Sequence, residues 1–149
     1  MTPSVGKGYV VLIVDDSREM LELIGESLTL LGDYTVLTAD NGADGLERAV
    51  IQRPDCLVID LKMPGLDGYQ LIHALRGDPS TAAMPLVILT ALTQDHYRLA
   101  GLLAGADQYL TKPVTPPELV AAIQEAIRLS TAERARRLSG LLDEPLEPS

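Results

Sequence analysis

Three carboxylates, a hydroxyl and an ammonium group follow four of the five short apolar runs of this 149-residue chain. Asp15 and Asp16 follow the first run, and Asp60 follows the third. Thr90 follows the fourth run, and Lys112 comes shortly after the fifth. If the runs are parallel strands, their carboxyl ends meet at one edge of a sheet, where open α/β folds bind ligands. The sequence therefore predicts a single site that contains all five groups.

The chemistry expected of such a site is the binding of a phosphoryl group. Three carboxylates repel one another, and a divalent cation relieves that repulsion. Oxygen ligands favour Mg²⁺, which keeps several waters and can also hold a phosphoryl oxygen. Lys112 and Thr90 would supply a cation and a hydrogen-bond donor to the other phosphoryl oxygens. Asp60 ends the run expected to be central, just before a turn that contains Pro64-Gly65, and is the expected nucleophile for an aspartyl-phosphate.

The apolar runs are expected to be strands because they are short and rich in β-branched residues. Most are continuous rather than alternating, which is typical of parallel strands buried on both faces. Segments with helical periodicity separate them, so the chain is predicted to form a parallel sheet with helices on both sides. The runs span residues 10–14, 34–38, 56–59, 86–89 and 108–110.

Capping residues and periodicity predict where the helices begin, where they end and which faces they bury. The first helix is expected to end near Gly32, and Asn41 is expected to cap the second. Thr93 is a candidate cap for the fourth helix, with Gly105 at its end, and residues 115–118 predict a capping box with proline at the first position of the fifth. The residues expected to face inward are Met20, Ile24, Leu28, Leu31, Ala43, Leu46, Val50, Leu71, Ile72, Leu75, Ala100, Leu103, Ala104, Leu119, Ile123, Ala126 and Ser130.

Four blocks of this sequence resemble the receiver domains of bacterial response regulators in two-component signalling. They are Asp15-Asp16, residues 60–68, Thr90-Ala91 and residues 105–113, and their order and spacing match the family over about residues 8–130. The resemblance implies a flavodoxin-like (βα)5 three-layer sandwich with a five-stranded parallel sheet of order 2-1-3-4-5. It also implies a phosphorylation-activated switch, which is not an enzyme and catalyses only its own phosphoryl transfer and dephosphorylation.

The resemblance assigns roles to the acidic residues. Asp60 would accept a phosphoryl group from a sensor histidine kinase or a phosphotransfer protein. Mg²⁺ would be held by Asp15, Asp16, Asp60 and the backbone carbonyl of Lys62.

Further roles implied by the resemblance fall on the ends of the last two strands. Thr90, the backbone amide of Ala91 and Lys112 would hold the phosphoryl oxygens, and the Lys112-Pro113 bond is often cis in the family. Thr90 and Tyr109 would be the switch pair, moving inward when Asp60 is phosphorylated. The signal would then leave through the face formed by the fourth helix, the last strand and the fifth helix.

The composition narrows the class of partner. The formal net charge of −9, from 12 basic and 21 acidic residues, disfavours direct binding to nucleic acid or to anionic membranes. The sequence has no apolar run long enough to span a bilayer, so we expect a cytoplasmic protein. The expected partners are the upstream kinase or phosphotransfer protein and a downstream protein or attached output domain. A phosphorylation-dependent homodimer stays open, although residues 118–125 lack the arginines that receivers of transcription factors tend to have there.

Three other classes of protein share parts of this pattern. A haloacid-dehalogenase-like phosphatase needs a second Asp two residues after its nucleophile as general acid and base, where this chain has Lys62. A receiver-like module that binds partners without phosphorylation usually lacks one of the acidic residues, the Thr or the Lys, and this chain keeps them all. A dinucleotide-binding domain needs Gly-x-Gly-x-x-Gly after its first strand, where residues 15–17 are Asp-Asp-Ser. The first two classes stay open as alternatives.

The remaining expectations concern single residues and the two ends of the chain. Cys56, the only cysteine, is expected to be an inert core thiol, and His73 and His96 are expected on the surface. Residues 1–7 are expected to be disordered and residues 8–130 to form the receiver domain. Residues 131–149 are expected to be a helical extension, in which Glu133 to Leu138 prolong the last helix, followed by an acidic disordered tail or truncated linker.

Overall fold

A parallel sheet of five strands lies at the centre of the computed structural model, which describes residues 8–32, 34–129 and 131–143. The strand order is β2-β1-β3-β4-β5, as expected, and each strand agrees with its predicted run to within one residue at either end. The strands are β1 (Val10–Val14), β2 (Thr35–Ala39), β3 (Cys56–Ile59), β4 (Leu86–Thr90) and β5 (Gln108–Thr111).

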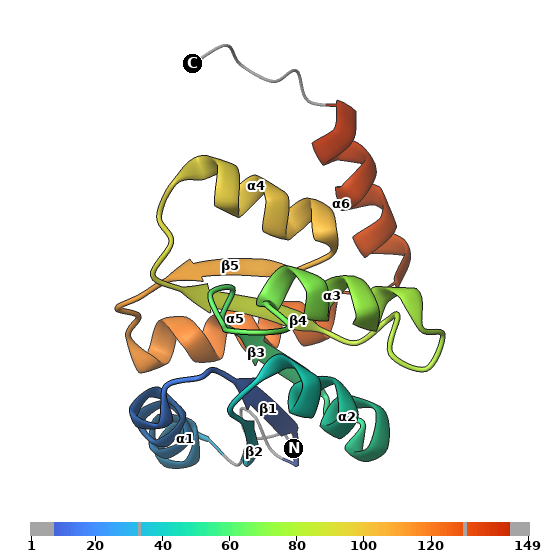
Figure 1. The fold of residues 1–149 in the computed structure, drawn as a ribbon. Helices are drawn as coiled ribbons and strands as arrows, with labels where there is room; N and C mark the ends of the chain where they lie inside the picture. Colours follow the sequence, from blue (N-terminus) through green and yellow to red (C-terminus); the bar gives the residue numbers. More distant parts are fainter. Residues whose placement is uncertain (1–7, 33, 130, 144–149) are drawn as a thin grey trace, which may run out of the picture.

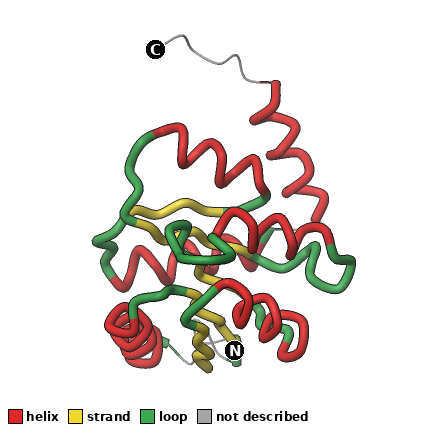
Figure 2. The backbone as a smooth tube through the Cα atoms, in the orientation of Figure 1, coloured by secondary structure: helices red, strands yellow, loops and turns green. Residues whose placement is uncertain are grey.

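Helices cover both faces of the sheet and complete a three-layer flavodoxin-like sandwich (Figure 1). One face is covered by α1 and α5, and the other by α2, α3 and α4, with a separate apolar core on each side. Figure 2 shows the strands enclosed between these two layers. The helices are α1 (Arg18–Leu31), α2 (Gly42–Gln52), α3 (Gly68–Gly77), α4 (Asp95–Ala104), α5 (Pro116–Arg128) and α6 (Thr131–Asp143).

Burial along the strands explains their position in the sheet. All residues of β3 and β4 are buried, whereas the edge strand β2 is largely exposed or half-buried. The parallel register pairs Val14 of β1 with Ile59 of β3. Asp15 and Asp60, which follow these two residues, are therefore neighbours at the same edge of the sheet.

The helix caps confirm Asn41 and Thr115, but the full capping box predicted at α5 does not form. Asn41 accepts a hydrogen bond from the Asp44 amide, and Thr115 accepts one from the Glu118 amide. At α5 the Glu118 carboxylate accepts from the Thr115 hydroxyl, so the reciprocal backbone bond of a capping box is replaced by a side-chain bond. Thr93 was wrong as a cap, because α4 begins after Gln94 and has no side-chain cap.

The predicted inward faces are correct for α3 and α5 and partly wrong for the others. Leu71, Ile72, Leu75, Leu119, Ile123 and Ala126 are buried, as are Ile24 and Leu28 of α1, whereas Ser130 lies outside the described residues. Met20, Leu46, Leu103 and Ala104 are half-buried. The residues wrongly expected to face inward, all exposed, are Leu31, Ala43, Val50 and Ala100.

Small residues at the helix–sheet contacts explain these errors. In α2 the buried residues are Gly42, Gly45 and Ala49, and a Cβ added at Gly45 would lie 2.9 Å from Val14. In α4 the buried residue is Gly101, which lies against Ile88. Periodicity analysis follows large apolar residues, so it misses a helix that approaches the sheet through glycine and alanine.

The chain after α5 differs from its predicted form. Residues 133–138 were expected to prolong α5, but α5 ends at Arg128, and Leu129 has an extended conformation. A separate helix, α6, then packs against α4, as Figure 1 shows. The disorder expected for residues 1–7 and the tail expected after α6 lie outside the described residues.

The single residues discussed above lie where they were expected. Cys56 is fully buried, and burial raises the pKa of its thiol, which fits an inert core residue. His73 and His96 are exposed. In the part of the chain that the structure describes, the helices are too short or too polar to cross a membrane.

Candidate functional site

The carboxyl ends of β1 and β3 bring the three predicted carboxylates together. One carboxylate oxygen from each of Asp15, Asp16 and Asp60 can be chosen so that all three lie within 4.8 Å of one another. Asp15 and Asp60 are only 2% and 7% exposed, whereas Asp16 faces solvent. The buried carboxylates of Asp15 and Asp60 and the exposed carboxylate of Asp16 together form a compact acidic cluster.

Lys112, just beyond β5, supplies the only ammonium group bonded to this cluster among the described residues. Its Nζ lies 2.8 Å from Asp15 Oδ2 and 3.1 Å from Asp60 Oδ2. The Lys112 amide donates to the Thr90 carbonyl at 2.8 Å, and the Lys112-Pro113 peptide bond is cis. The backbone of β4 therefore fixes the start of the segment that carries the ammonium.

Burial and neighbouring charges act in opposite directions on the pKa values of Asp15 and Lys112. Burial raises the pKa of Asp15 above its ordinary value, although the hydrogen bond from Lys112 and the one from the Ser17 amide lower it. Burial alone would lower the pKa of Lys112, but its bonds and attraction to Asp15 and Asp60 outweigh that effect, so the pKa is raised. The carboxylate is the more deeply buried partner, which is why desolvation dominates on its side.

A cavity of about 500 Å³ opens beside Asp60. The Lys62 amide donates to Asp60 Oδ1 at 3.3 Å, so the chain turns tightly around the carboxylate. Gly65, with φ of +76°, allows this turn, and Gly68 packs so closely that an added Cβ would lie 2.4 Å from the Asp60 carbonyl. The residues lining the cavity are Asp16, Asp60, Lys62, Met63, Pro64, Thr90, Ala91 and Leu92.

Of the two predicted switch residues, Thr90 lines this cavity and Tyr109 bonds to Leu92, which also lines it. Thr90 is buried, and its hydroxyl accepts a weak bond from the Leu92 amide at 3.4 Å. Tyr109 is also buried, and its hydroxyl donates to the Leu92 carbonyl at 2.7 Å. Burial raises the pKa of Tyr109 to about 12. Both residues are therefore connected to Leu92, in the loop that leads into α4.

The donor set of the cluster fits Mg²⁺. Three carboxylates face one ammonium, which leaves an excess of negative charge for a cation to offset. All the side-chain donors are oxygens, as Mg²⁺ requires, and the exposed Asp16 leaves the site open to water.

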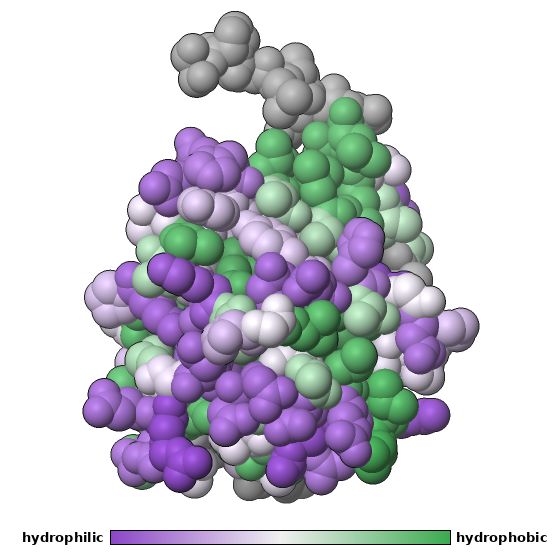
Figure 3. All heavy atoms as spheres, viewed as in Figure 1, coloured by the Kyte–Doolittle hydropathy of each residue, from purple (hydrophilic) through white to green (hydrophobic). Residues whose placement is uncertain are grey.

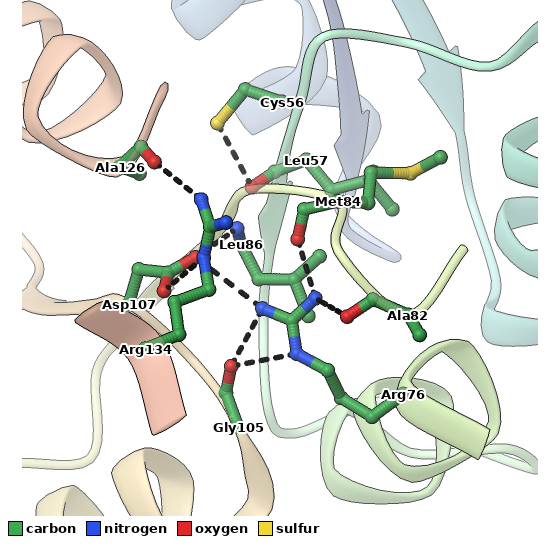
Figure 4. A network of polar contacts seen from close by, with 10 residues as sticks. All are labelled: Cys56, Leu57, Arg76, Ala82, Met84, Leu86, Gly105, Asp107, Ala126 and Arg134. Carbon is green, nitrogen blue, oxygen red and sulfur yellow. Dashed lines mark hydrogen bonds and ion pairs between the residues drawn. The ribbon is translucent and has the colours of Figure 1, made fainter. Parts of the chain in front are cut away.

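A second group of polar side chains, around Asp107, was not predicted as a unit. Asp107 was expected only as part of a motif block, and the structure buries it among two arginines and a backbone amide (Figure 4). In the sequence, a buried aspartate just before an apolar run cannot be distinguished from an exposed turn residue at the same place. This group lies apart from the cavity at Asp60, since the two share no residue.

Comparison with known proteins identifies the family. The profile of the response regulator receiver domain matches residues 11–124. The chain belongs to this family. It is therefore a phosphorylation-activated regulatory domain rather than an enzyme with a substrate of its own, and the phosphatase alternative is not favoured.

Curated relatives of this receiver domain are longer proteins. It is 34% identical over 142 residues to the phosphate regulon transcriptional regulatory protein PhoB of Pseudomonas aeruginosa, covering 93% of this chain and 62% of that protein. It is 40% identical over 125 residues to the response regulator MprA of Mycobacterium tuberculosis, covering 84% of this chain and 53% of that protein. The chain thus spans about half to three-fifths of the length of these relatives.

Solved structures show the same fold. The chemotaxis protein CheY4 of Vibrio cholerae has a TM-score of 0.74 and 30% identity, with 79% of this chain and 98% of that chain covered. A response regulator from Chloroflexus aurantiacus has a TM-score of 0.73 and 36% identity, with 83% and 100% covered.

Proposed function

We propose that Asp60 accepts a phosphoryl group and that its phosphorylation changes the face formed by α4, β5 and α5. The observation that carries this proposal is the position of the Asp60 carboxylate, which borders the 500 Å³ cavity while bonded to Lys112 and next to Asp15 and Asp16. A nucleophilic carboxylate needs open space for its electrophile and positive charge for the product, and both are present here.

The transfer step uses the Asp60 carboxylate as nucleophile. A carboxylate oxygen attacks the phosphorus of a phosphohistidine on the donor protein. The new O–P bond forms as the P–N bond breaks, and the electron pair leaves with the imidazole, which is then protonated. Lys112 already reaches Asp60, so a small movement of its ammonium would bring it to a phosphoryl oxygen.

The acidic side of the cavity would hold Mg²⁺. Asp15, Asp16, Asp60 and the backbone carbonyl of Lys62 would hold the ion. When bound, the ion offsets the negative charge of the carboxylates and the incoming phosphoryl group. The exposed Asp16 and the bonded, buried Asp15 differ in role, since only Asp16 is free of the Lys112 ammonium.

The conformational change begins at Thr90. Thr90 and Ala91 line the cavity, and the Thr90 hydroxyl and the Ala91 amide would bind the remaining phosphoryl oxygens. If Thr90 moves to donate a hydrogen bond to a phosphoryl oxygen, the weak bond that it accepts from the Leu92 amide would lengthen, and the Leu92 carbonyl accepts the bond from Tyr109. The Thr90–Tyr109 pair would thus pass the phosphorylation state to α4 and β5.

Protein partners fit this chain better than nucleic acid. We infer that a histidine kinase or a phosphotransfer protein supplies the phosphoryl group, since the relatives include response regulators, and that the chain acts in the cytoplasm. PhoB is a transcriptional regulatory protein and is longer than this chain, so an attached output domain or a separate downstream protein would receive the signal. The net charge of −9 supports protein contacts rather than direct DNA binding by residues 8–130, which we propose form the receiver unit.

Intact mass spectrometry after incubation with acetyl phosphate and Mg²⁺ tests the assignment of Asp60. The wild type should gain one acid-labile phosphoryl group, Asp60→Asn should gain none, and the exposed control Asp95→Asn should behave as wild type. Labelling of Asp60→Asn at the wild-type rate contradicts the proposal. An unlabelled wild type favours the module that binds partners without phosphorylation.

A further inference from the structure

One buried carboxylate joins three elements at the end of the sheet opposite to the Asp60 site. Asp107, 3% exposed, lies just before β5. Its Oδ2 accepts from the Leu86 amide at 2.9 Å and from Arg76 of α3 at 3.3 Å. Its Oδ1 accepts from Nε of Arg134 of α6 at 2.7 Å (Figure 4). Both oxygens are therefore occupied, and one of them holds α6.

Arg134 forms a buried ion pair with Asp107 rather than a surface one. Its side chain is 10% exposed, and its second nitrogen donates to the Ala126 carbonyl in the last turn of α5 at 2.6 Å. The guanidinium therefore lies between the end of α5 and Asp107. Arg134 thus attaches α6 to the receiver core through Asp107. Removal of either partner would leave a buried charge unpaired, which is strongly destabilising.

The apolar contact between α6 and α4 is incompletely packed. A cavity of about 170 Å³ remains between them, lined by Leu102 and Gly105 on one side and by Leu138 and Leu141 on the other. Figure 3 shows apolar side chains gathered where α6 lies beside α4. An incompletely filled contact can change its packing while the remainder of the core stays intact.

The same end of α4 is connected to the predicted switch. Gly101 of α4 packs so closely that an added Cβ would lie 2.5 Å from Ile88 Cδ1 and 3.3 Å from Tyr109 Cδ2. The carbonyl of Gly105, at the end of α4, accepts two hydrogen bonds from Arg76, which also bonds Asp107. A movement of Tyr109 or of the loop at Leu92 would therefore shift α4 against Arg76, and α6, which packs on α4, would move with it.

We propose that α4 and α6 move as one coupled unit, joined through the Asp107–Arg134 ion pair, and that α6 carries the state of the switch to the C-terminal part of the chain. The second part rests on the proposed function of Asp60. Coupling is reciprocal, so loosening α6 must also change the stability of α4. The signal would then have an outlet through α6, in addition to the α4–β5–α5 face.

Amide hydrogen exchange of Arg134→Ala, with Arg136→Ala as control, tests the coupling. Arg136 is an exposed arginine on the same helix, so both changes alter helix propensity equally. Arg134→Ala should speed exchange roughly tenfold or more in residues 131–143 and also in residues 101–107, since a charge-assisted bond at Asp107 is lost. Arg136→Ala should leave both segments unchanged. Faster exchange in α6 alone, with α4 unchanged, overturns the proposal.

Variants at Gly101 and Tyr109 test the coupling of α4 with α6 without phosphorylation of Asp60. Gly101→Ala should push α4 away from Ile88 and Tyr109 and alter exchange in α6, and the milder Tyr109→Phe should act in the same direction. An unchanged α6 in both variants also overturns the coupling. Beryllofluoride with Mg²⁺ should alter exchange in α6 of the wild type, and this effect should disappear in Arg134→Ala. If mass spectrometry shows no labelling at Asp60 while the variants show coupling, the proposed function fails and the coupling of α4 with α6 stands.

Discussion

The ammonium of Lys112 lies 3.1 Å from the carboxylate of Asp60, although 52 residues separate the two in the chain. The contact exists because β3 and β5 end at the same edge of the sheet, with β4 between them. It places a positive charge at the nucleophile proposed for phosphorylation, and it leads to the first prediction.

Lys112→Gln should separate phosphoryl binding from metal binding. Loss of the ammonium removes a bond to the phosphoryl group, so labelling by acetyl phosphate should slow roughly 10- to 100-fold, since a bond to a charged group contributes about 1.5–3 kcal/mol. Binding of Mg²⁺ should persist or tighten, because the acidic cluster loses its cation. Intact mass and Mg²⁺ titration by calorimetry measure the two effects. Unchanged labelling would exclude a role for Lys112 in the transfer.

Mg²⁺ should raise the melting temperature of the wild type through the acidic cluster. At ten times its dissociation constant, an ion bound only to the folded state stabilises by about 1.4 kcal/mol. Asp16→Asn should lose this shift while folding normally, because Asp16 is exposed and does not bond Lys112. Thermal melts with Mg²⁺ and with a chelator measure it, with Asp95→Asn as the control. An equal shift in Asp16→Asn would remove that residue from the metal site.

Lys62 should prolong the phosphorylated state. Its exposed side chain borders the cavity two residues after Asp60, where it can offset phosphoryl charge and restrict the attacking water. An exposed ion pair contributes at most about 1 kcal/mol, so Lys62→Asn should lose its phosphoryl group up to about fivefold faster than wild type. Lys62→Arg keeps the charge and should lose its phosphoryl group slowly. The decay after removal of the donor is the measurement, and unchanged or slower decay in Lys62→Asn would refute this role.

Asp107→Ala should destabilise the fold far more than loss of a helix cap. The change leaves Arg76 and Arg134 without their carboxylate and the Leu86 amide without its acceptor, so the free energy of unfolding should fall by about 3–5 kcal/mol. Asp67→Ala, which removes only the cap of α3, should lower it by about 1 kcal/mol. Urea unfolding of both variants measures the difference. Equal losses would mean that the Asp107 cluster contributes little.

Much of the fold and of the candidate site could be predicted from local sequence. Short apolar runs rich in β-branched residues identified the strands to within one residue, and the runs of β3 and β4 are continuous because both strands are buried along their length. The polar residues that end these runs were predicted to meet, and Asp15, Asp16, Asp60 and Lys112 do lie together. The helix faces were less predictable, because α2 and α4 approach the sheet through glycine and alanine.

The sequence by itself determined which residues end the strands, and so which side chains can meet at the carboxyl edge of a parallel sheet. Only the tertiary structure decided that Asp107 is buried and that α6 is a separate helix joined to it by Arg134. The physical reason is the range of the interactions involved. Strand identity depends on neighbours in the chain, whereas the burial of Asp107 depends on Arg76 and Arg134, which lie 31 and 27 residues away and meet it only after the layers have packed.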